Sequence, residues 1–162
     1  MKKVITIATA IIISFLLHAP SVCVAETKDT WIREEYQVYI EEISNQYGVC
    51  PELIMAIVEH ESSGRADATN KGCKGLMQIN AKYHQDRMER LGVTDIYDPY
   101  SNILIGTDYI MELAEKHEEL PLVLMVYNGT KNAIERWENE DYTGYAIRIM
   151  RRAEELERVH GK

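Results

Sequence analysis

The chain has 162 residues, of which 46% are hydrophobic and 27% are charged. This balance excludes a largely disordered protein, and the length predicts one folded domain. The formal net charge is −8, and an acidic chain lacks the basic face that binding to phosphate groups requires. Nucleic acid is therefore excluded as a partner.

The first 25 residues have the layout of a secretory signal peptide. Lys2 and Lys3 give a basic start, and residues 4–17 are almost wholly apolar and carry no charge. Ala25 is a small residue, after which we place the cleavage site. A retained membrane anchor is the alternative, although the apolar run is short for a membrane-spanning helix. We expect export to the periplasm, cell wall or extracellular space, with residues 26–162 as the folded domain.

The chain after the signal peptide is predicted to be mainly helical. Apolar residues recur every three or four positions from Trp31 to Tyr47, and Gly48 is suited to end that helix. Pro51 is suited to the first turn of the next helix. Residues 53–58 are apolar on every side, which predicts a buried central helix.

The second half of the chain shows four further helical segments and no strong strand pattern. Residues 64–80 are rich in Gly, Asn, Asp and Lys, which predicts a loop or a small hairpin. The expected helices are Ala81–Leu91, Asp98–His117, Leu122–Tyr127 and Tyr142–Val159. We interpret Asp98 as the N-cap of its helix and not as a catalytic carboxylate.

Glu61 lies at the C-terminal end of the predicted central helix. The helix dipole disfavours a negative charge there, and burial would also raise the pKa of the carboxyl group. The position therefore predicts a neutral carboxyl group that can donate a proton. His60 and Glu61 do not form a zinc-protease motif, because Gly64 stands where that motif needs a second histidine.

Two cysteines, Cys50 and Cys73, remain after the signal peptide. Outside the cytoplasm such a pair tends to oxidise, so we predict a disulfide between them, with two free thiols as the alternative. The bridge would close a loop of roughly twenty residues and contribute about 3 kcal/mol. Two cysteines and scattered histidines do not supply the four ligands of a structural zinc site, so no metal site is expected.

Four segments, in the expected order, resemble those of the soluble lytic transglycosylases. They are Glu61-Ser62, Gly75-Leu76-Met77-Gln78-Ile79-Asn80, Asp98-Pro99 with Asn102-Ile103 and Gly106, and Tyr127-Asn128-Gly129. A weaker match is Thr143 to Tyr145, and the resemblance covers roughly residues 45–150. It implies a lysozyme-like α+β fold that is predominantly helical, with an apolar central helix and a small loop or hairpin lobe.

The resemblance also implies a reaction that needs no cofactor. In the family, the glutamate that matches Glu61 protonates the glycosidic oxygen between N-acetylmuramic acid and N-acetylglucosamine in peptidoglycan. It then removes the proton of the muramic 6-hydroxyl, which closes onto the anomeric carbon and leaves a 1,6-anhydro end. Tyr127 is implied to point its hydroxyl toward this glutamate, and we count both residues as catalytic candidates.

The resemblance further implies a set of polar residues that contact the sugars: Ser62, Asn70, Gln78, Asn80 and Tyr145. The amides of Gln78 and Asn80 are suited to sugar hydroxyl and acetamido groups. Asn70 stands where the family often has serine, and Tyr145 fits the apolar stripe of the last helix equally well. The sequence also departs from the family pattern at residues 64–66 and in the shorter turn after Tyr127.

Two other functions remain open. A hydrolase similar to goose-type lysozymes would need a positioned water, which an extra carboxylate such as Asp67 could hold. A noncatalytic peptidoglycan-binding scaffold would be expected to lack the acid, whereas Glu61 is present. The expected partner is the peptidoglycan glycan strand, bound by a monomer. By analogy, small exported relatives open the wall for secretion, conjugation or phage assemblies.

Overall fold

The computed structural model describes residues 29–162, so the predicted signal peptide lies outside the described residues. These residues form seven α-helices, one 3-10 helix and one hairpin. The helices are α1 Glu34–Tyr47, α2 Pro51–Ser62, η1 Ala81–Tyr83, α3 Gln85–Arg90, α4 Pro99–Lys116, α5 Leu120–Tyr127, α6 Ala133–Glu138 and α7 Gly144–Val159, and the strands are β1 Thr69–Asn70 and β2 Cys73–Lys74. None of the helices within 29–162 is long and apolar enough to cross a lipid bilayer.

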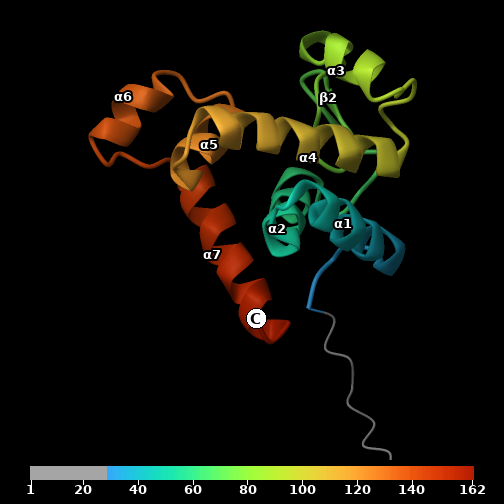
Figure 1. The fold of residues 1–162 in the computed structure, drawn as a ribbon, viewed down its shortest axis with the longest axis horizontal. Helices are drawn as coiled ribbons and strands as arrows, with labels where there is room; N and C mark the ends of the chain where they lie inside the picture. Colours follow the sequence, from blue (N-terminus) through green and yellow to red (C-terminus); the bar gives the residue numbers. More distant parts are fainter. Residues whose placement is uncertain (1–28) are drawn as a thin grey trace, which may run out of the picture.

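The apolar helix α2 lies at the centre of the fold, as the sequence predicted. Every residue from Leu53 to Val58 is buried. This burial arises because α2 packs against both α1 and α7. Figure 1 shows α2 between these two helices, with α4 and α5 crossing above them. The last residues of the central helix, including Glu61, therefore extend from the buried core.

Three helices begin or end at residues that favour capping positions. Gly48 adopts a left-handed conformation with φ of 70° and ends α1. The Asp98 carboxylate accepts a hydrogen bond from the backbone N–H of Ser101 at 2.8 Å, which confirms it as the N-cap of α4. Thr143 accepts from the backbone N–H of Ala146 at 3.3 Å, so α7 begins after Thr143 and not at Tyr142.

Two further predicted helices differ from those observed, and one observed helix was not predicted. The first helix begins at Glu34 and not at Trp31, which is 72% exposed and precedes the N-cap. The segment Ala81–Leu91 is divided into η1 and α3, because His84 leaves helical geometry with φ of −125° and ψ of 20°. Helix α6 was not predicted, since its six residues are too few to show a helical period.

The loop after β2 is fixed to α4 by a buried amide. The side chain of Asn102 accepts a hydrogen bond from the backbone N–H of Met77 at 2.8 Å and donates to the carbonyls of Lys74 and Ile96, each at 2.9 Å. Gly75 makes this approach possible: its φ is +76°, and a Cβ atom there would lie 2.3 Å from the Asn102 amide. Leu76 and Met77 are fully buried and pack the loop down.

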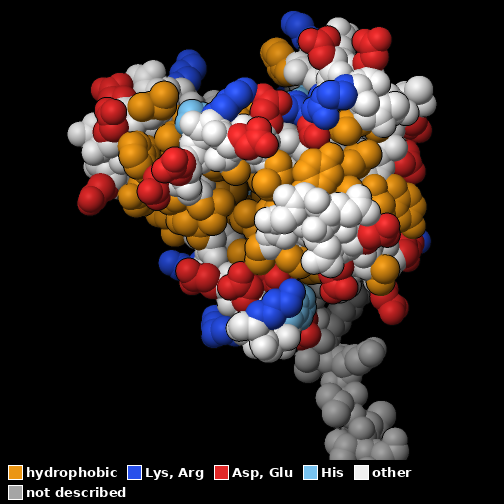
Figure 2. All heavy atoms as spheres, in the orientation of Figure 1, with side chains coloured by type: hydrophobic (Ala, Val, Ile, Leu, Met, Phe, Trp, Pro, Cys, Tyr) orange, Lys and Arg blue, Asp and Glu red, His pale blue; other side chains and the backbone are white. Residues whose placement is uncertain are grey.

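The C-terminal end of α7 contacts the first turn of α2. Glu52 on α2 is only 1% exposed. One of its oxygens lies 2.9 Å from His160 Nδ1 and 2.7 Å from Lys162 Nζ. Figure 2 shows basic, acidic and histidine side chains gathered at this end of the molecule, near the terminus marked C in Figure 1.

Candidate active site

Glu61 occupies the last turn of α2, where the buried helix meets a groove. Its side chain is half-buried, and its Oε1 accepts a hydrogen bond from the hydroxyl of Tyr145 at 2.7 Å. Burial raises the pKa of Glu61 above its ordinary value, and the Tyr145 hydrogen bond opposes this only in part. The direction agrees with the expectation from the sequence. The carboxyl group is therefore suited to donate a proton.

Glu59 is on the same helix, two residues before Glu61, and has the opposite environment. Its Oε2 accepts a hydrogen bond from Nε of Arg152 at 2.6 Å. Burial is the largest influence and would raise the pKa of Glu59. The hydrogen bonds from Arg152, Thr30 and the Trp31 backbone, together with the charge of Arg152, outweigh it, and the pKa is lowered. Two neighbouring carboxyl groups thus favour different protonation states, and of these two only Glu61 lines the groove.

Tyr145 is a direct partner of Glu61. It is 6% exposed, and the ring of His60 meets it edge-on with the ring centres 5.0 Å apart. Burial, followed by the negative charge of Glu61, raises the pKa of Tyr145 far above its usual value, so the hydroxyl keeps its proton and donates. Tyr145 is not among the residues lining the groove. The structure therefore gives it the position relative to Glu61 that the resemblance implied for Tyr127.

Tyr127 lines the groove from α5, but its hydroxyl bonds to the loop. It donates to the backbone carbonyl of Met77 at 2.8 Å. Tyr127 lines the same groove as Glu61, and burial and then the charge of Glu61 raise the pKa of Tyr127, so its hydroxyl stays neutral. The expectation that this hydroxyl points to Glu61 is not met. Tyr127 instead holds α5 against the segment that contains Gln78.

A groove of about 540 Å³ runs past Glu61, between the hairpin lobe and helices α4 and α5. Three predicted sugar contacts line it: Asn70, Gln78 and Asn80. The Gln78 amide nitrogen donates to the carbonyls of Ala68 and Gly75, at 3.1 and 2.9 Å. The Asn80 side-chain oxygen caps η1 by accepting from the N–H of Lys82 at 3.1 Å. These bonds orient both amides and leave the oxygen of Gln78 and the nitrogen of Asn80 for a ligand.

The comparison with protein families decides the assignment of this chain. The family model described as the transglycosylase SLT domain matches residues 38–149, which is more than half of the chain. The chain belongs to this family. The matched range includes Glu61, Tyr145 and the residues that line the groove.

The relatives of this SLT domain agree with the match. The transglycosylase of Enterobacteria phage PRD1 is 34% identical over 90 residues, which is 55% of this chain and 32% of that protein. The membrane-bound lytic murein transglycosylase E of Buchnera aphidicola is 38% identical over 81 residues, which is 45% of this chain and 37% of that protein. The chain thus spans about a third of the length of both.

A solved structure confirms the predicted fold class. An inactive mutant of the lytic transglycosylase Slt from Pseudomonas aeruginosa aligns with a TM-score of 0.67 and 17% sequence identity, covering 77% of this chain and 24% of that one. Together with the seven helices and the single hairpin of residues 29–162, the match establishes a lysozyme-like α+β fold that is predominantly helical.

The structure of the SLT domain corrects the prediction for Ser62. This residue is 3% exposed, and its hydroxyl donates to the carbonyl of Val58 at 3.1 Å, one turn back along α2. It is not among the residues lining the groove. Because side chains on consecutive helix positions point in different directions, Ser62 faces the core while Glu61 faces the groove.

The predicted disulfide is also wrong, since Cys50 and Cys73 are both free thiols in the structure. Cys50 immediately precedes α2, whereas Cys73 lines the groove beside Glu61 at the other end of that helix. A helix of 12 residues is about 18 Å long. Both cysteines adjoin the central helix, as the sequence indicated, but α2 holds them apart.

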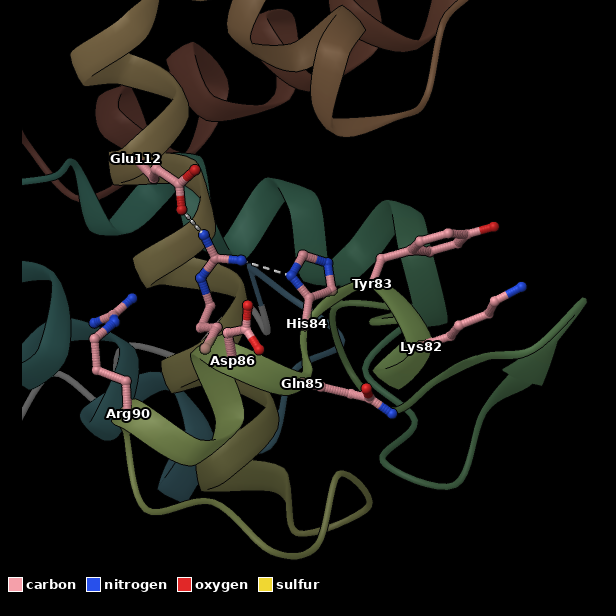
Figure 3. Close-up of a pocket in the computed structure, with 8 residues that line it drawn as sticks. Lys82, Tyr83, His84, Gln85, Asp86, Arg90 and Glu112 are labelled. Carbon is pink, nitrogen blue, oxygen red and sulfur yellow. Dashed lines mark hydrogen bonds and ion pairs between the residues drawn. The ribbon is translucent and has the colours of Figure 1, made fainter.

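A second hollow, which the sequence did not predict, adjoins the groove and shares Tyr83, His84, Arg87 and Glu112 with it. Arg87 is 8% exposed and hydrogen-bonds to His84, Glu112 and, at 2.7 Å, Asp108. Figure 3 shows His84 and Glu112 turned toward one guanidinium group, while Lys82 and Tyr83 project outward. No sequence pattern marks this cluster, because Arg87 and Asp108 are 21 positions apart.

Proposed function

We propose that this SLT domain is a peptidoglycan lytic transglycosylase. It would cut the β-1,4 bond between N-acetylmuramic acid and N-acetylglucosamine and leave 1,6-anhydro-muramic acid ends. The observation that carries the proposal is the half-buried carboxyl group of Glu61, which has a raised pKa and lines an open groove. The names of the phage and Buchnera relatives support the same reaction.

Proton donation by Glu61 would start the reaction. A neutral carboxyl group protonates the leaving glycosidic oxygen while positive charge develops on the muramic ring. The carboxylate that results is stabilised by the Tyr145 hydroxyl at 2.7 Å. It can then take the proton of the muramic 6-hydroxyl as that oxygen bonds to the anomeric carbon. The proton returns Glu61 to its neutral form, and no water is consumed.

The acidic residues of the groove favour this route over hydrolysis. Most glycoside hydrolases use two carboxyl groups, one of which is a nucleophile or activates a water. The other acidic residue lining the groove, within the part of the chain that the structure describes, is Glu112. Glu112 is hydrogen-bonded to Arg87 and Lys116, and its pKa is lowered first by the Lys116 bond. Asp67, the candidate for holding a water, is not among the lining residues.

We also propose that Gln78, Asn80 and Asn70 bind the sugars, since their polar groups line the groove that Glu61 faces. Export by way of residues 1–25 fits a wall substrate, and a monomer is sufficient for the site as described. The protein would act beside a wall-spanning secretion, conjugation or phage assembly, and the phage origin of one relative is consistent with the last of these.

The products of the reaction test the proposal directly. The purified protein is incubated with peptidoglycan, and the released fragments are identified by mass spectrometry, with heat-denatured protein as the control. Fragments that end in 1,6-anhydro-muramic acid, lighter by one water than hydrolysis products, are expected. Reducing ends in their place would establish the lysozyme-like hydrolase, and no release of fragments would favour a noncatalytic scaffold.

A further inference from the structure

The second hollow joins the groove that Glu61 lines, and the reaction proposed above gives this hollow no part. Its volume of about 490 Å³ lies in the range of about 300 to 1,000 Å³ that is usual for small-molecule sites. The hollow and the groove meet, because they share lining residues that include Tyr83 and His84. A linear glycan would occupy the groove alone. A hollow that branches from the groove fits a substrate that is itself branched.

His84 lies where the two cavities meet, at the break between η1 and α3. Its Nδ1 lies 2.6 Å from Nη1 of Arg87, and a guanidinium group can only donate, so Nδ1 is the acceptor. In the neutral ring the proton is therefore on Nε2. Burial, followed by the charge of Arg87, lowers the pKa of His84 and favours this neutral form. Nε2 thus carries an N–H group, and no side chain or carbonyl within residues 29–162 accepts from it.

The ring of His84 is held in place by two neighbours. It meets the ring of Tyr109 edge-on, with the ring centres 4.7 Å apart. The guanidinium of Arg87, which donates to His84, lies 4.8 Å from the centre of the same tyrosine ring and is bonded to Asp108 at 2.7 Å. Because these contacts fix the ring, the N–H group of Nε2 is oriented before a ligand arrives, and little conformational freedom is lost on binding.

The charged side chains of the second hollow differ in whether they are already paired. Arg87, Arg90 and Glu112 all belong to ion pairs. Among the residues that the structure describes, Lys82 and Asp86 form no ion pair with another side chain, although both line the hollow. In the view of Figure 3, Lys82 and Asp86 lie on either side of His84. The hollow therefore offers a ligand one cation, one anion and one N–H donor.

The stem peptides of peptidoglycan carry the groups that match this set. Each peptide is attached to the lactyl group of an N-acetylmuramic acid, so it branches from the glycan strand. The N-acetylated sugars of the strand are uncharged, whereas the peptide has carboxylates and, where it is not cross-linked, a free amino group. Its amide carbonyls are hydrogen-bond acceptors. A strand without peptides would leave the charges of Lys82 and Asp86 unused.

We propose that the second hollow binds the stem peptide of the muramic acid residue that occupies the groove, through Lys82, His84 and Asp86. The N–H group of His84 Nε2 donates to a carbonyl oxygen of the peptide. Lys82 pairs with a peptide carboxylate, and Asp86 pairs with the free amino group. This inference rests on the proposed function and narrows its substrate to glycan strands that still carry their peptides.

The preference is measured as the ratio of kcat/KM on strands that carry stem peptides to kcat/KM on the same strands after an amidase has removed them. The wild type should favour the strands with peptides. The ratio should fall about three- to tenfold in His84→Phe, which keeps a ring against Tyr109 but lacks the donor. It should fall about two- to fivefold in Lys82→Ala.

Arg151→Ala is the control for these variants. It also removes a positive charge, but Arg151 is exposed on α7 and lines neither cavity, so the ratio should stay at the wild-type value. Equal rates of the wild type on both kinds of strand would overturn the proposal. Equal falls of the ratio in all three variants would do the same.

Binding without cleavage separates this inference from the proposed function. A single N-acetylmuramoyl tetrapeptide has no bond between sugars to cut, so it can be titrated into the isotope-labelled full chain and followed by NMR. The backbone amide signals of residues 82–86 should shift with this ligand but not with N-acetylmuramic acid. Such shifts in a protein that does not cut peptidoglycan would support the peptide site and refute the reaction. Cleavage without these shifts would overturn the peptide site alone.

Discussion

The hydrogen bond between Tyr145 and Glu61 controls the pH range in which Glu61 can donate a proton. At 2.7 Å it stabilises the carboxylate, and so it lowers a pKa that burial raises. A hydrogen bond to a charged group contributes about 1.5 to 3 kcal/mol, and one pKa unit corresponds to about 1.4 kcal/mol. Tyr145→Phe is therefore expected to raise the pKa of Glu61 by about one to two units.

The measurement is kcat/KM for the release of soluble fragments from peptidoglycan as a function of pH. Because cleavage requires the neutral form of Glu61, activity falls as the pH rises through its pKa in the free enzyme. In Tyr145→Phe this basic limb should move to higher pH by about one to two units. The rate on the plateau should also fall, because the carboxylate formed after proton transfer has lost its hydrogen bond.

Tyr127→Phe is the matched control for this experiment. It also removes one hydroxyl from a tyrosine close to Glu61, but that hydroxyl donates to the carbonyl of Met77. Its basic limb should stay at the wild-type pH, while the free energy of unfolding falls by about 1 kcal/mol. A basic limb that is unmoved or moves to lower pH in Tyr145→Phe would refute the reasoning, as would equal shifts in both variants.

Three further predictions concern stability, measured by urea unfolding. Gly75→Ala should lower the free energy of unfolding by more than about 2 kcal/mol, because φ is +76° and the new Cβ would meet the Asn102 amide at 2.3 Å. Asn102→Ala should lower the free energy of unfolding by about 3 kcal/mol, since the hydrogen bonds to Met77, Lys74 and Ile96 are lost. Wild-type stability in either variant would contradict the role given to this contact. Hydrogen bonds from Lys162, His160 and Cys50 together outweigh burial and lower the pKa of Glu52 from 4.5 to about 2. The lowered pKa stabilises the folded protein by about 3 kcal/mol above pH 4.5, and this stabilisation is lost as the pH falls toward 2. Glu52→Gln should therefore flatten the acid limb of the plot of stability against pH, and an unchanged limb would contradict this prediction.

The parts of the fold that the sequence predicted correctly depend on local patterns. An unbroken apolar run identified α2 as the buried helix, and Gly48 and Asp98 lie at the helix ends that the sequence predicted for them. The capping contacts span three or four residues, so they can be recognised without tertiary structure. Helix α6 escaped recognition because six residues show no period.

The candidate site was predictable in its residues but not in their contacts. The position of Glu61 at the end of a buried helix was sufficient to predict the direction of its pKa shift. The exchange of roles between Tyr127 and Tyr145 was not, because Tyr145 and Glu61 are 84 positions apart and meet only through the packing of α2 against α7. The failed disulfide has the same origin, since adjacency to one helix does not tell which end a thiol will occupy.

The central claim is that Glu61, and not its neighbour on the same helix, is the proton donor. It is tested most directly by comparing Glu61→Gln with Glu59→Gln in the release of anhydro-ended fragments from peptidoglycan, each at a temperature where circular dichroism shows a folded protein. Both variants replace a carboxyl group with an amide two residues apart, but Glu59 is ion-paired to Arg152 and Glu61 lines the groove. We predict that Glu61→Gln loses about 10²- to 10⁴-fold in rate, while Glu59→Gln keeps its rate within about tenfold. An active Glu61→Gln enzyme, or an equal loss in both variants, would contradict the account.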